Sequence, residues 1–401
     1  MRKTSPAVFF LLITIFLTST LQASNKDILL YGRDGIKRID KAIEAYQKLV
    51  KKDGWEKLEI TADYKEKGKF KKIIPGEKHA LIPSIRKRLM ATGELKKKSD
   101  SDVYDEDLKN AVIAFQTRHG LENDGVIGAG TIDAMNVSPE SRLNQLKVNR
   151  ERFAKASWPP AKYIHANIPD YQLYAVRDLK TELQMRIVVG LKKNWNTPEV
   201  QSQIKNVVLN PKWHVPTKII KKELLKKIIK EPDYLEKQNM SVFEMKDGEK
   251  VEIDPATYDW KTADPAKLQI VQDSGDDNAL GHIKFLFPNP YDIYMHDTPQ
   301  KSFFSHQMRA ASHGCVRVQK PMDLAHFVFS GTSLEKVWTE EKIKKEIEKN
   351  ETLFILIKEP VDVFVDYFTA WVDEDGVINF REDIYKKDVS TPASTSIEKS
   401  L

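Results

Sequence analysis

Residues 294–318 read YMHDTPQKSFFSHQMRAASHGCVRV, and this stretch contains Cys315, the only cysteine of the sequence. A thiol attacks a carbonyl carbon only as the thiolate, so it needs a neighbouring base or positive charge. His313 and His296 are both candidates for that base. Gly314 allows the backbone to turn sharply beside the thiol, and the N–H groups of such a turn can bind an oxyanion. The stretch therefore predicts a cysteine nucleophile that works in acyl transfer.

The composition limits the class of protein. The 401 residues carry a formal net charge of +6, and 41% are hydrophobic and 30% charged. These values are typical of a globular protein and exclude a disordered chain or a multispan membrane protein. The charge is too small to predict nucleic-acid binding, although it is compatible with a weak attraction to an anionic polymer. The histidines lack metal-ligand spacing and a second cysteine is missing, so we expect no metal and no cofactor.

The first residues have the pattern of an export signal. Arg2 and Lys3 precede an apolar run at 7–17, and small and polar residues then lead to a cleavage site after Ala23. The apolar run is shorter than the roughly 20 residues that a membrane span needs. We therefore expect a cleaved signal peptide at 1–23 and an exported protein, with an uncleaved membrane anchor as the alternative. No cysteine follows the signal, which argues against a lipid anchor.

The next two segments differ in pattern. Residues 24–76 are rich in lysine, and we expect an N-terminal scaffold segment to which no function is assigned. Residues 77–138 predict a unit of three short helices, because apolar residues recur at helical spacing between glycine-containing ends. We expect Phe115, Leu121 and Ile132 to lie in its core.

Residues 111–136, AVIAFQTRHGLENDGVIGAGTIDAMN, carry a resemblance to a known family. Their Phe-Gln, His-Gly-Leu, Asp-Gly and Ile-Gly spacings are similar to those of the peptidoglycan-binding domain that accompanies many cell-wall enzymes. The resemblance implies that residues 77–138 bind the wall or position another domain on it. We interpret His119 as a residue at a helix end and not as a ligand.

The remaining chain predicts a multidomain α+β protein. A helical connector at 139–162 precedes a β-rich domain at 163–340, where apolar residues alternate with a period of two. A basic helix and turn-rich residues at 214–275 interrupt that domain, and we expect an insertion that caps a site. Residues 341–388 are expected to be a C-terminal scaffold part, and 389–401 a disordered tail.

The spacing of His296 and the sequence Ser-His-Gly-Cys at 312–315 resembles the signature of the L,D-transpeptidases. The match is closer to the large periplasmic subfamily that carries a peptidoglycan-binding domain and a capping subdomain. Asn-Pro-Lys-Trp-His-Val-Pro at 210–216 and Asn-Ala-Leu-Gly at 278–281 are also similar to that subfamily. One departure is the acidic run at 272–277, where the family has a richer content of proline and glycine.

The resemblance implies roles for five residues. Cys315 would be the nucleophile, and His296 the general base that forms a thiolate–imidazolium pair with it. His313 and Gly314 would shape the acyl site and the oxyanion hole, and Arg317 would orient the active-site loop or the substrate.

Five residues are candidates for substrate binding, among them Arg317. Ser312 fits the Ser/Thr position of the family signature. Tyr294 lies two residues before His296 on a predicted strand, so both side chains would face the same side. Arg309 could clamp a substrate carboxylate, and Trp213 either lines the site or belongs to the core. Asp297 would point away from His296, because adjacent strand residues face opposite sides.

The implied reaction is a two-step acyl transfer on peptidoglycan. The thiol would attack the tetrapeptide stem at its third residue, a diamino acid, and release the terminal D-Ala. An amine of a second stem would resolve the thioester and form a 3-3 cross-link, and carbapenems would acylate the same thiol.

Alternatives stay open at this stage. Water as the acceptor would give an L,D-carboxypeptidase, and a protein amine would tether an outer-membrane protein to the wall. Two further hypotheses for the function are a cysteine protease that cleaves ordinary L-peptides and a non-enzymatic wall-binding protein. The resemblance implies the periplasm, with stem peptides and glycan as partners, no nucleic acid, and at most a weak membrane or outer-membrane protein partner.

Overall fold

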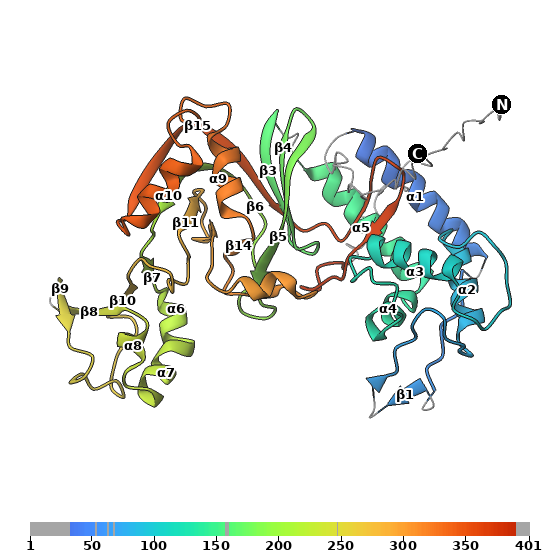
Figure 1. Ribbon diagram of the computed structural model, residues 1–401, viewed down its shortest axis with the longest axis horizontal. Coiled ribbons are helices and arrows are strands. Elements are labelled where there is room, and N and C mark those ends of the chain that lie inside the picture. Colours follow the sequence, from blue (N-terminus) through green and yellow to red (C-terminus); the bar gives the residue numbers. More distant parts are fainter. Residues whose placement is uncertain are drawn as a thin grey trace, which may run out of the picture.

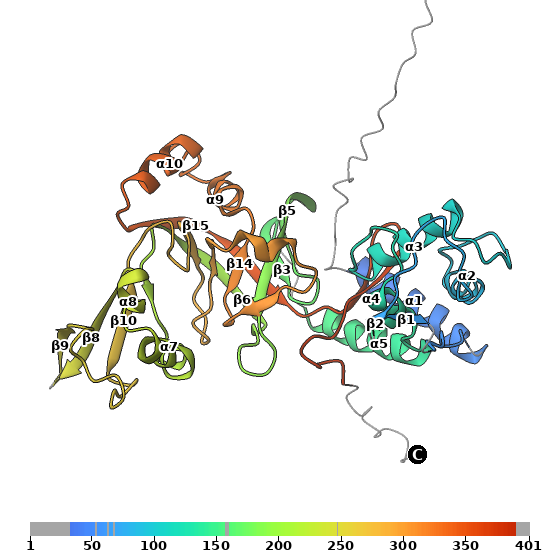
Figure 2. The ribbon, with the colours of Figure 1, turned by 60° about the horizontal axis from the view of Figure 1, so that its bottom comes forward.

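The computed structural model of the chain describes residues 33–389, except 53, 62–63, 67–68, 157–159 and 247 (Figure 1). The predicted signal peptide and residues 390–401 of the predicted tail lie outside the described residues. Within the described part, no helix combines the length and apolar character that a membrane crossing requires. The helices at the N-terminal end and the insertion after β6 lie at opposite ends of a central sheet (Figure 1, Figure 2).

The central sheet has nine strands in the described chain, in the order β13-β5-β14-β12-β11-β6-β15-β3-β4. Since β4 also pairs with β5, the sheet closes on itself. The strands are β3 (Lys162–Asn167), β4 (Gln172–Arg177), β5 (Lys180–Gly190), β6 (Val200–Leu209), β11 (Ile283–Leu286), β12 (Met295–His296), β13 (Ala310–Ser312), β14 (Val316–Val318) and β15 (Leu353–Asp366).

The period-two pattern of these strands places one set of side chains inside. Met185, Ile187 and Val189 alternate along β5 and are buried in the largest core cluster. Helix α9 (Pro321–Phe329) packs on this core through buried side chains such as Leu324 and Val328. Burying an aliphatic side chain stabilises the fold by about 1.5–3 kcal/mol. Several such side chains on one face of a strand therefore determine which face points into the core.

The C-terminal part of the chain corrects a predicted boundary. After α10 (Glu340–Glu348), the long strand β15 pairs with β6 on one side and with β3 on the other. It therefore lies inside the central sheet, and the predicted division at residue 340 would separate one strand from the sheet that it completes. The strand order depends on pairings between distant segments, which the local pattern of residues 341–388 does not contain.

An insertion between β6 and β11 forms a separate small layer, which we call the cap. Its four-stranded sheet has the order β7-β10-β8-β9, and its own hydrophobic cluster lies between this sheet and the helices. The predicted basic helix runs through three pieces, of which the middle one is π-helical. The elements are β7 (Trp213–His214), α6 (Thr217–Ile219), the π-helical turn η2 (Ile220–Leu224), α7 (Leu225–Lys230), α8 (Tyr234–Lys237), β8 (Met240–Lys246), β9 (Glu249–Ile253) and β10 (Leu268–Gln272).

The predicted three-helix unit is formed by α2 (Ile82–Ala91), α3 (Glu106–Arg118) and α4 (Ala129–Met135). Asp105 caps α3 by accepting a hydrogen bond from the N–H of Leu108, which satisfies one free donor of the first turn. Phe115 and Ile132 are buried in the core of the unit, and Leu121 packs against it partly buried. His119 is the C-cap residue of α3.

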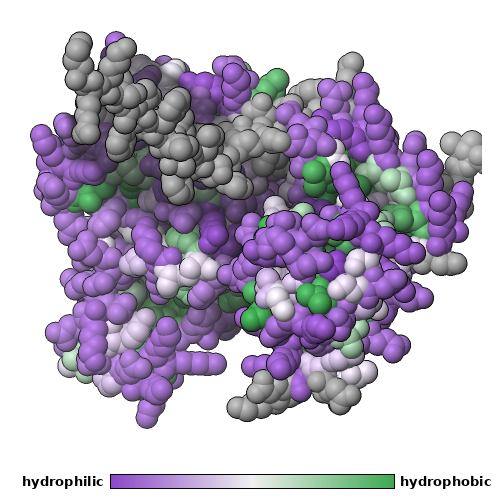
Figure 3. All heavy atoms as spheres, turned by 45° about the vertical axis from the view of Figure 1, so that its right-hand side comes forward, coloured by the Kyte–Doolittle hydropathy of each residue, from purple (hydrophilic) through white to green (hydrophobic). Residues whose placement is uncertain are grey.

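The scaffold joins both ends of the described chain. Helix α1 (Arg33–Lys51) packs on α5 (Pro139–Lys155) and on β16 (Ala370–Val372), which pairs with β17 (Ile378–Phe380). A short hairpin of β1 (Lys65–Glu66) and β2 (Lys69–Phe70) precedes α2. The face in Figure 3 is mostly hydrophilic, with small separate hydrophobic patches.

Candidate active site

Two short parallel strands bring the predicted nucleophile and base together. In β12 and β14, Met295 lies opposite Val316 and His296 lies opposite Arg317. Met295 and Val316 are buried in the core of the closed sheet. Because side chains alternate along a strand, His296 and Arg317 lie on the other face, and Cys315 directly precedes β14. Cys315 is half-buried and is a free thiol.

The turn before the nucleophile is held by hydrogen bonds. Gly314 has a φ of +116°, a conformation that residues with a Cβ rarely adopt. The hydroxyl of Ser312 donates to the carbonyl of Cys315 at 2.6 Å and accepts from the N–H of Gly314 at 3.1 Å. Thr197 donates its hydroxyl to the carbonyl of Gly314 at 2.8 Å. Ser312 is buried, so these contacts hold the turn and do not offer its hydroxyl to a substrate.

The turn leaves one candidate oxyanion donor. Since the N–H of Gly314 is bound by Ser312, it is occupied within the turn. The N–H of Cys315, in contrast, has no hydrogen-bond partner among the residues that the structure describes. The expected oxyanion hole therefore has its candidate donor at Cys315, and Gly314 contributes the turn that positions it.

His296 is held as a neutral base. Its Nδ1 lies 2.5 Å from the carbonyl oxygen of Asp297, and because that oxygen can only accept, Nδ1 carries the proton of the neutral ring. The backbone of Leu280 also forms a hydrogen bond with the imidazole. Burial lowers the pKa of His296 to about 3, and the positive charges of Arg317 and Lys284 act in the same direction. Asp297 thus orients His296 through its backbone, while its side chain contacts Lys301 and the N–H of His282.

Cys315 is protonated in the same surroundings. Burial raises the pKa of Cys315, and this outweighs the hydrogen bonds from Tyr294 and the positive charges of Lys284 and Arg317, which lower the pKa. Burial thus disfavours the charged form of each group, the thiolate of Cys315 and the imidazolium of His296.

Tyr294 and Lys284 complete this face of the sheet. The ring of Tyr294 lies 5.6 Å from that of His296, and burial raises the pKa of the Tyr294 phenol well above its usual value. Lys284 lies opposite His296 on β11, and its Nζ is 3.8 Å from the centre of the Tyr294 ring. Sequence reasoning missed Lys284, although its place between the buried Ile283 and Phe285 predicts a side chain on the opposite face.

His313 faces the cap. Its Nε2 lies 3.0 Å from both carboxylate oxygens of Glu223, which belongs to η2. The ring of Trp195 stands edge-on to the His313 ring with 4.7 Å between their centres, and Lys218 of the cap lies 4.2 Å above Trp195. His313 thus joins the turn before Cys315 to the cap.

Arg317 contacts the loop that follows β12. Its Nη1 donates to the side-chain carbonyl of Gln300 at 2.9 Å, and its guanidinium lies 5.5 Å from the ring centre of Phe303, on the short helix η3 (Lys301–Ser305). The positive charge of Arg317 also acts on Cys315. These contacts are compatible with the expected role of orienting the loop.

Two further predicted substrate contacts, besides that of Ser312, are corrected. Arg309 donates through its guanidinium to the backbone carbonyls of Ile187, His306 and Tyr171, so its donors hold the protein backbone instead of a carboxylate. Trp213 lies opposite Gln272 in the cap sheet and packs against the hydrophobic cluster of the cap. Of the two expectations for Trp213, lining the site or belonging to a core, the structure shows the second. Both assignments required tertiary contacts that the spacing of these residues does not contain.

Among the described residues, no group of three or more His, Cys, Asp or Glu side chains is placed to hold a metal ion. The site therefore consists of a thiol, an oriented imidazole, a phenol and two cations. Groups of this kind can support acyl transfer through a thiol.

Comparison with known proteins identifies two domains of the chain. Residues 161–338 match the family model described as "L,D-transpeptidase catalytic domain", and residues 78–135 match "Putative peptidoglycan binding domain". A protein of Haemophilus influenzae named "Putative L,D-transpeptidase" is 36% identical over 225 residues, which are 56% of this chain and 44% of that relative. The chain thus spans less than half of the relative's length. It carries an L,D-transpeptidase catalytic domain and a peptidoglycan-binding domain, as the resemblance indicated.

Solved structures were also compared. An L,D-transpeptidase of Stackebrandtia nassauensis is 13% identical with a TM-score of 0.27, and the match covers 73% of this chain and 94% of that one. An L,D-transpeptidase of Xylanimonas cellulosilytica is 14% identical with a TM-score of 0.23, and the match covers 73% and 97%. The family assignment therefore stands on the sequence matches.

Proposed function

We propose that Cys315 forms 3-3 cross-links in peptidoglycan by acyl transfer between tetrapeptide stems. One observation supports the proposal: Cys315 directly precedes the strand whose Arg317 lies opposite His296, and Nδ1 of His296 is hydrogen-bonded to the carbonyl of Asp297. The Nε2 of His296 is then the atom that accepts the thiol proton. The match of residues 161–338 to an L,D-transpeptidase catalytic domain also supports the proposal.

The first step moves one proton and one acyl group. The thiol proton passes to Nε2 of His296, and the thiolate attacks the carbonyl carbon between the third and fourth residues of the stem. The oxyanion accepts a hydrogen bond from the N–H of Cys315. The terminal D-residue leaves as an amine after taking the proton back from His296, and a thioester remains on Cys315.

The second step returns the enzyme to its starting state. The neutral side-chain amine of a second stem attacks the thioester carbon, and His296 takes the proton that the nitrogen loses as the amide forms. Collapse of the intermediate releases the thiolate of Cys315, which recovers its proton from His296.

We also propose that the protein acts in the periplasm and that carbapenems inhibit it. The basic and apolar pattern of residues 1–23 supports export, and the stem peptide as substrate places the enzyme in the periplasm. Carbapenems would acylate Cys315 at the atom that attacks the stem. Stem peptides and glycan are the proposed partners.

The test uses residues 24–401 and purified tetrapeptide muropeptides, with Cys315→Ala as the matched variant. Mass spectrometry is expected to find a cross-linked dimer that has lost one D-Ala, and none with the variant. Tripeptide without dimer would instead establish an L,D-carboxypeptidase. Absence of both products, together with absence of carbapenem acylation at Cys315, would refute the catalytic proposal and leave a wall-binding protein.

A further inference from the structure

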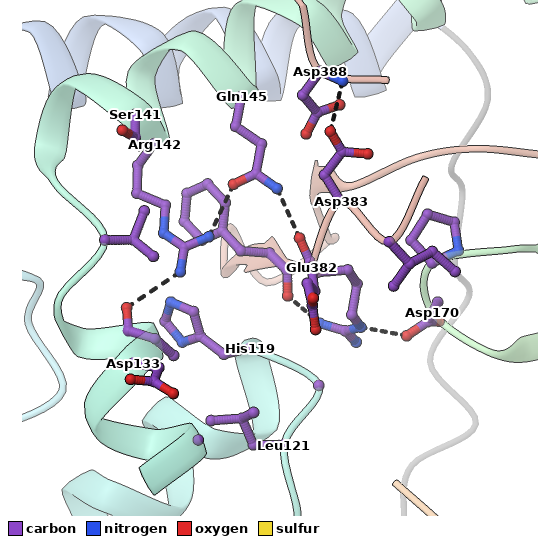
Figure 4. Close-up of a pocket in the computed structure, with 18 of the residues that line it drawn as sticks. His119, Leu121, Asp133, Ser141, Arg142, Gln145, Asp170, Glu382, Asp383 and Asp388 are labelled. Atoms are coloured by element: carbon purple, nitrogen blue, oxygen red, sulfur yellow. Dashed lines mark hydrogen bonds and ion pairs between the residues drawn. The ribbon is translucent and has the colours of Figure 1, made fainter. Parts of the chain in front are cut away.

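Cations at the junction of the three-helix unit, α5 and the central sheet domain are held by protein groups. The junction contains a cavity of about 940 Å³, where the guanidinium of Arg142 donates to Gln145 at 2.9 Å (Figure 4). In the same lining, Arg381 lies on the carboxylate of Asp170. These two cations are therefore paired within the protein and call for no ligand.

One cation beside the catalytic turn is held differently. Arg317 donates to the side chain of Gln300 at 2.9 Å, and Lys301 binds the carboxylate of Asp297. Lys284 is half-buried, and it has neither a carboxylate partner nor a hydrogen-bond acceptor among the residues that the structure describes. Its Nζ is not enclosed by protein atoms, so a ligand can reach it. The ammonium group therefore has three donors for a group that the described chain does not supply.

The strand register places Lys284 beside the reacting atoms. Lys284 lies opposite His296 in β11 and β12, and residues that are paired in antiparallel strands point to the same face of a sheet. Its Nζ lies 3.8 Å from the centre of the Tyr294 ring, and the side chain of Tyr294 is hydrogen-bonded to Cys315. The ammonium group and the thiol therefore contact the same tyrosine side chain.

The electrostatics of Lys284 favour an anionic ligand. Burial lowers the pKa of Lys284, and the negative charge of the Cys315 thiolate opposes this effect. His214 of the cap strand β7 lies within reach of the same charge. Burial lowers the pKa of His214, and the charges of Lys250 and Lys284 act in the same direction. An anion placed at Nζ would favour the charged form of Lys284 and offset the cost of its burial.

A tetrapeptide stem carries a carboxylate close to the bond that is attacked. Cys315 attacks the carbonyl carbon of the third residue, and the carboxylate of the terminal D-residue lies one residue further, roughly 3.5 Å along an extended chain. We propose that Lys284 binds this terminal carboxylate of the donor stem and so aligns the preceding peptide bond with the thiol. Since the carboxylate departs with the D-residue, the contact orients the first step and does not hold the acyl-enzyme. The inference rests on the proposed function and deepens it.

The test compares two peptides that differ in one charge. They are the sugar-free tetrapeptide and the same peptide with a C-terminal amide, so the attacked bond is the same and D-alanine or D-alaninamide leaves. We expect residues 24–401 to prefer the carboxylate by about tenfold or more in kcat/KM, since a hydrogen bond to a charged group is among the stronger ones. The preference should appear mainly in KM, because the contact already forms in the bound ground state.

Three variants show whether Lys284 causes the preference. Lys284→Met is expected to reduce it to nearly one, whereas Lys284→Arg keeps the cation and should keep most of it. Lys284→Met also raises the pKa of the thiol, but that change slows both peptides by the same factor and cancels in the ratio. Lys205→Met, at an exposed position of β6, is the control and should retain the parent preference. Thermal unfolding confirms that each variant is folded.

Binding separates this inference from the proposed function. Isothermal titration calorimetry of both peptides is carried out with Cys315→Ala, in which the thiol plays no part, with and without Lys284→Met. If stems are cross-linked but the two peptides react and bind equally well, or if Lys284→Met keeps the preference, only the inference on Lys284 fails. If the carboxylate is preferred in binding through Lys284 while no stem reacts, the proposed reaction fails and the carboxylate site stands. Absence of both binding and reaction would overturn both.

Discussion

Glu223 of the cap and His313 of the catalytic turn meet through one ring nitrogen, which lies 3.0 Å from both carboxylate oxygens. The two residues are 90 positions apart, and Glu223 belongs to a π-helical turn. Turns of this kind are frequent at functional sites, because the extra residue in the turn re-aims a side chain. The pair therefore gives the cap a direct contact with the residue that is two positions before the nucleophile.

Loss of this contact should weaken the positioning of the turn. The two side chains are 31% and 40% exposed, so the pair is worth about 0.5–1 kcal/mol, or roughly a two- to fivefold change. We expect Glu223→Ala to reduce kcat/KM on tetrapeptides by that factor and Glu223→Gln to reduce it less, since an amide keeps one hydrogen bond. Glu231→Ala, on an exposed cap residue, is the control. Parent rates in Glu223→Ala would show that the contact has no role in positioning.

The pair also shows where sequence reasoning stops. Cys315, His296 and His313 could be picked out from one short stretch, and the family resemblance implied which histidine is the base. Glu223 was not predictable as a partner of His313, because an exposed glutamate on a basic helix has the same local pattern wherever the helix docks. The corrected place of Arg309, on three backbone carbonyls, has the same origin.

Some features of the fold were likewise predictable from the sequence and others were not. Alternating residues in β5 and helical spacing in α3 predicted those elements, since burial of one face is a local property of the sequence. The place of β15 between β6 and β3 was missed because strand order depends on pairing between segments that are far apart in the chain. Lys284 is an intermediate case, since its outward direction was readable and its position opposite His296 was not.

The reactivity of the free thiol should rise with pH and depend on Lys284. Burial raises the pKa of Cys315 and the charge of Lys284 opposes this, so the neutral thiol dominates at neutral pH. We expect iodoacetamide to label Cys315 slowly at pH 7 and faster as the pH increases. Lys284→Met should slow labelling at every pH below the plateau, because the thiol pKa rises further. Lys205→Met, at an exposed position of β6, is the control. Fast labelling with a plateau below pH 7 would contradict the protonated thiol.

His296 should remain neutral far below the usual histidine range. Its pKa is about 3, with burial as the main cause and Arg317 as the next. A lowered pKa means that the imidazole is neutral above that value and gains a proton only as the pH falls through it. NMR of isotope-labelled histidine should therefore show no titration of His296 between pH 8 and pH 5. Arg317→Gln removes a positive charge and should move the titration to higher pH. A midpoint near 6.5 in the parent protein would refute this assignment.

Arg381 should be a main determinant of stability at the junction of the domains. Its Nε lies 2.5 Å from the carboxylate of Asp170, and its Nη1 donates to the carbonyls of Arg118 and Phe380. The side chain of Asp170 is only 4% exposed and also accepts from the hydroxyl of Tyr174. Removing the guanidinium therefore leaves a buried carboxylate without its cation, which typically costs 3–5 kcal/mol.

The prediction is tested by a double-mutant cycle on this pair. We expect Arg381→Ala to lower the free energy of unfolding by roughly 3–5 kcal/mol, measured by urea denaturation. Asp170→Asn should cost less, because it removes the charge that needs a partner. The double variant should then be less destabilised than the sum of the two, since neither residue is left as an isolated buried ion. Additive effects would mean that Arg381 acts through its backbone contacts at Arg118 and Phe380 and not through Asp170.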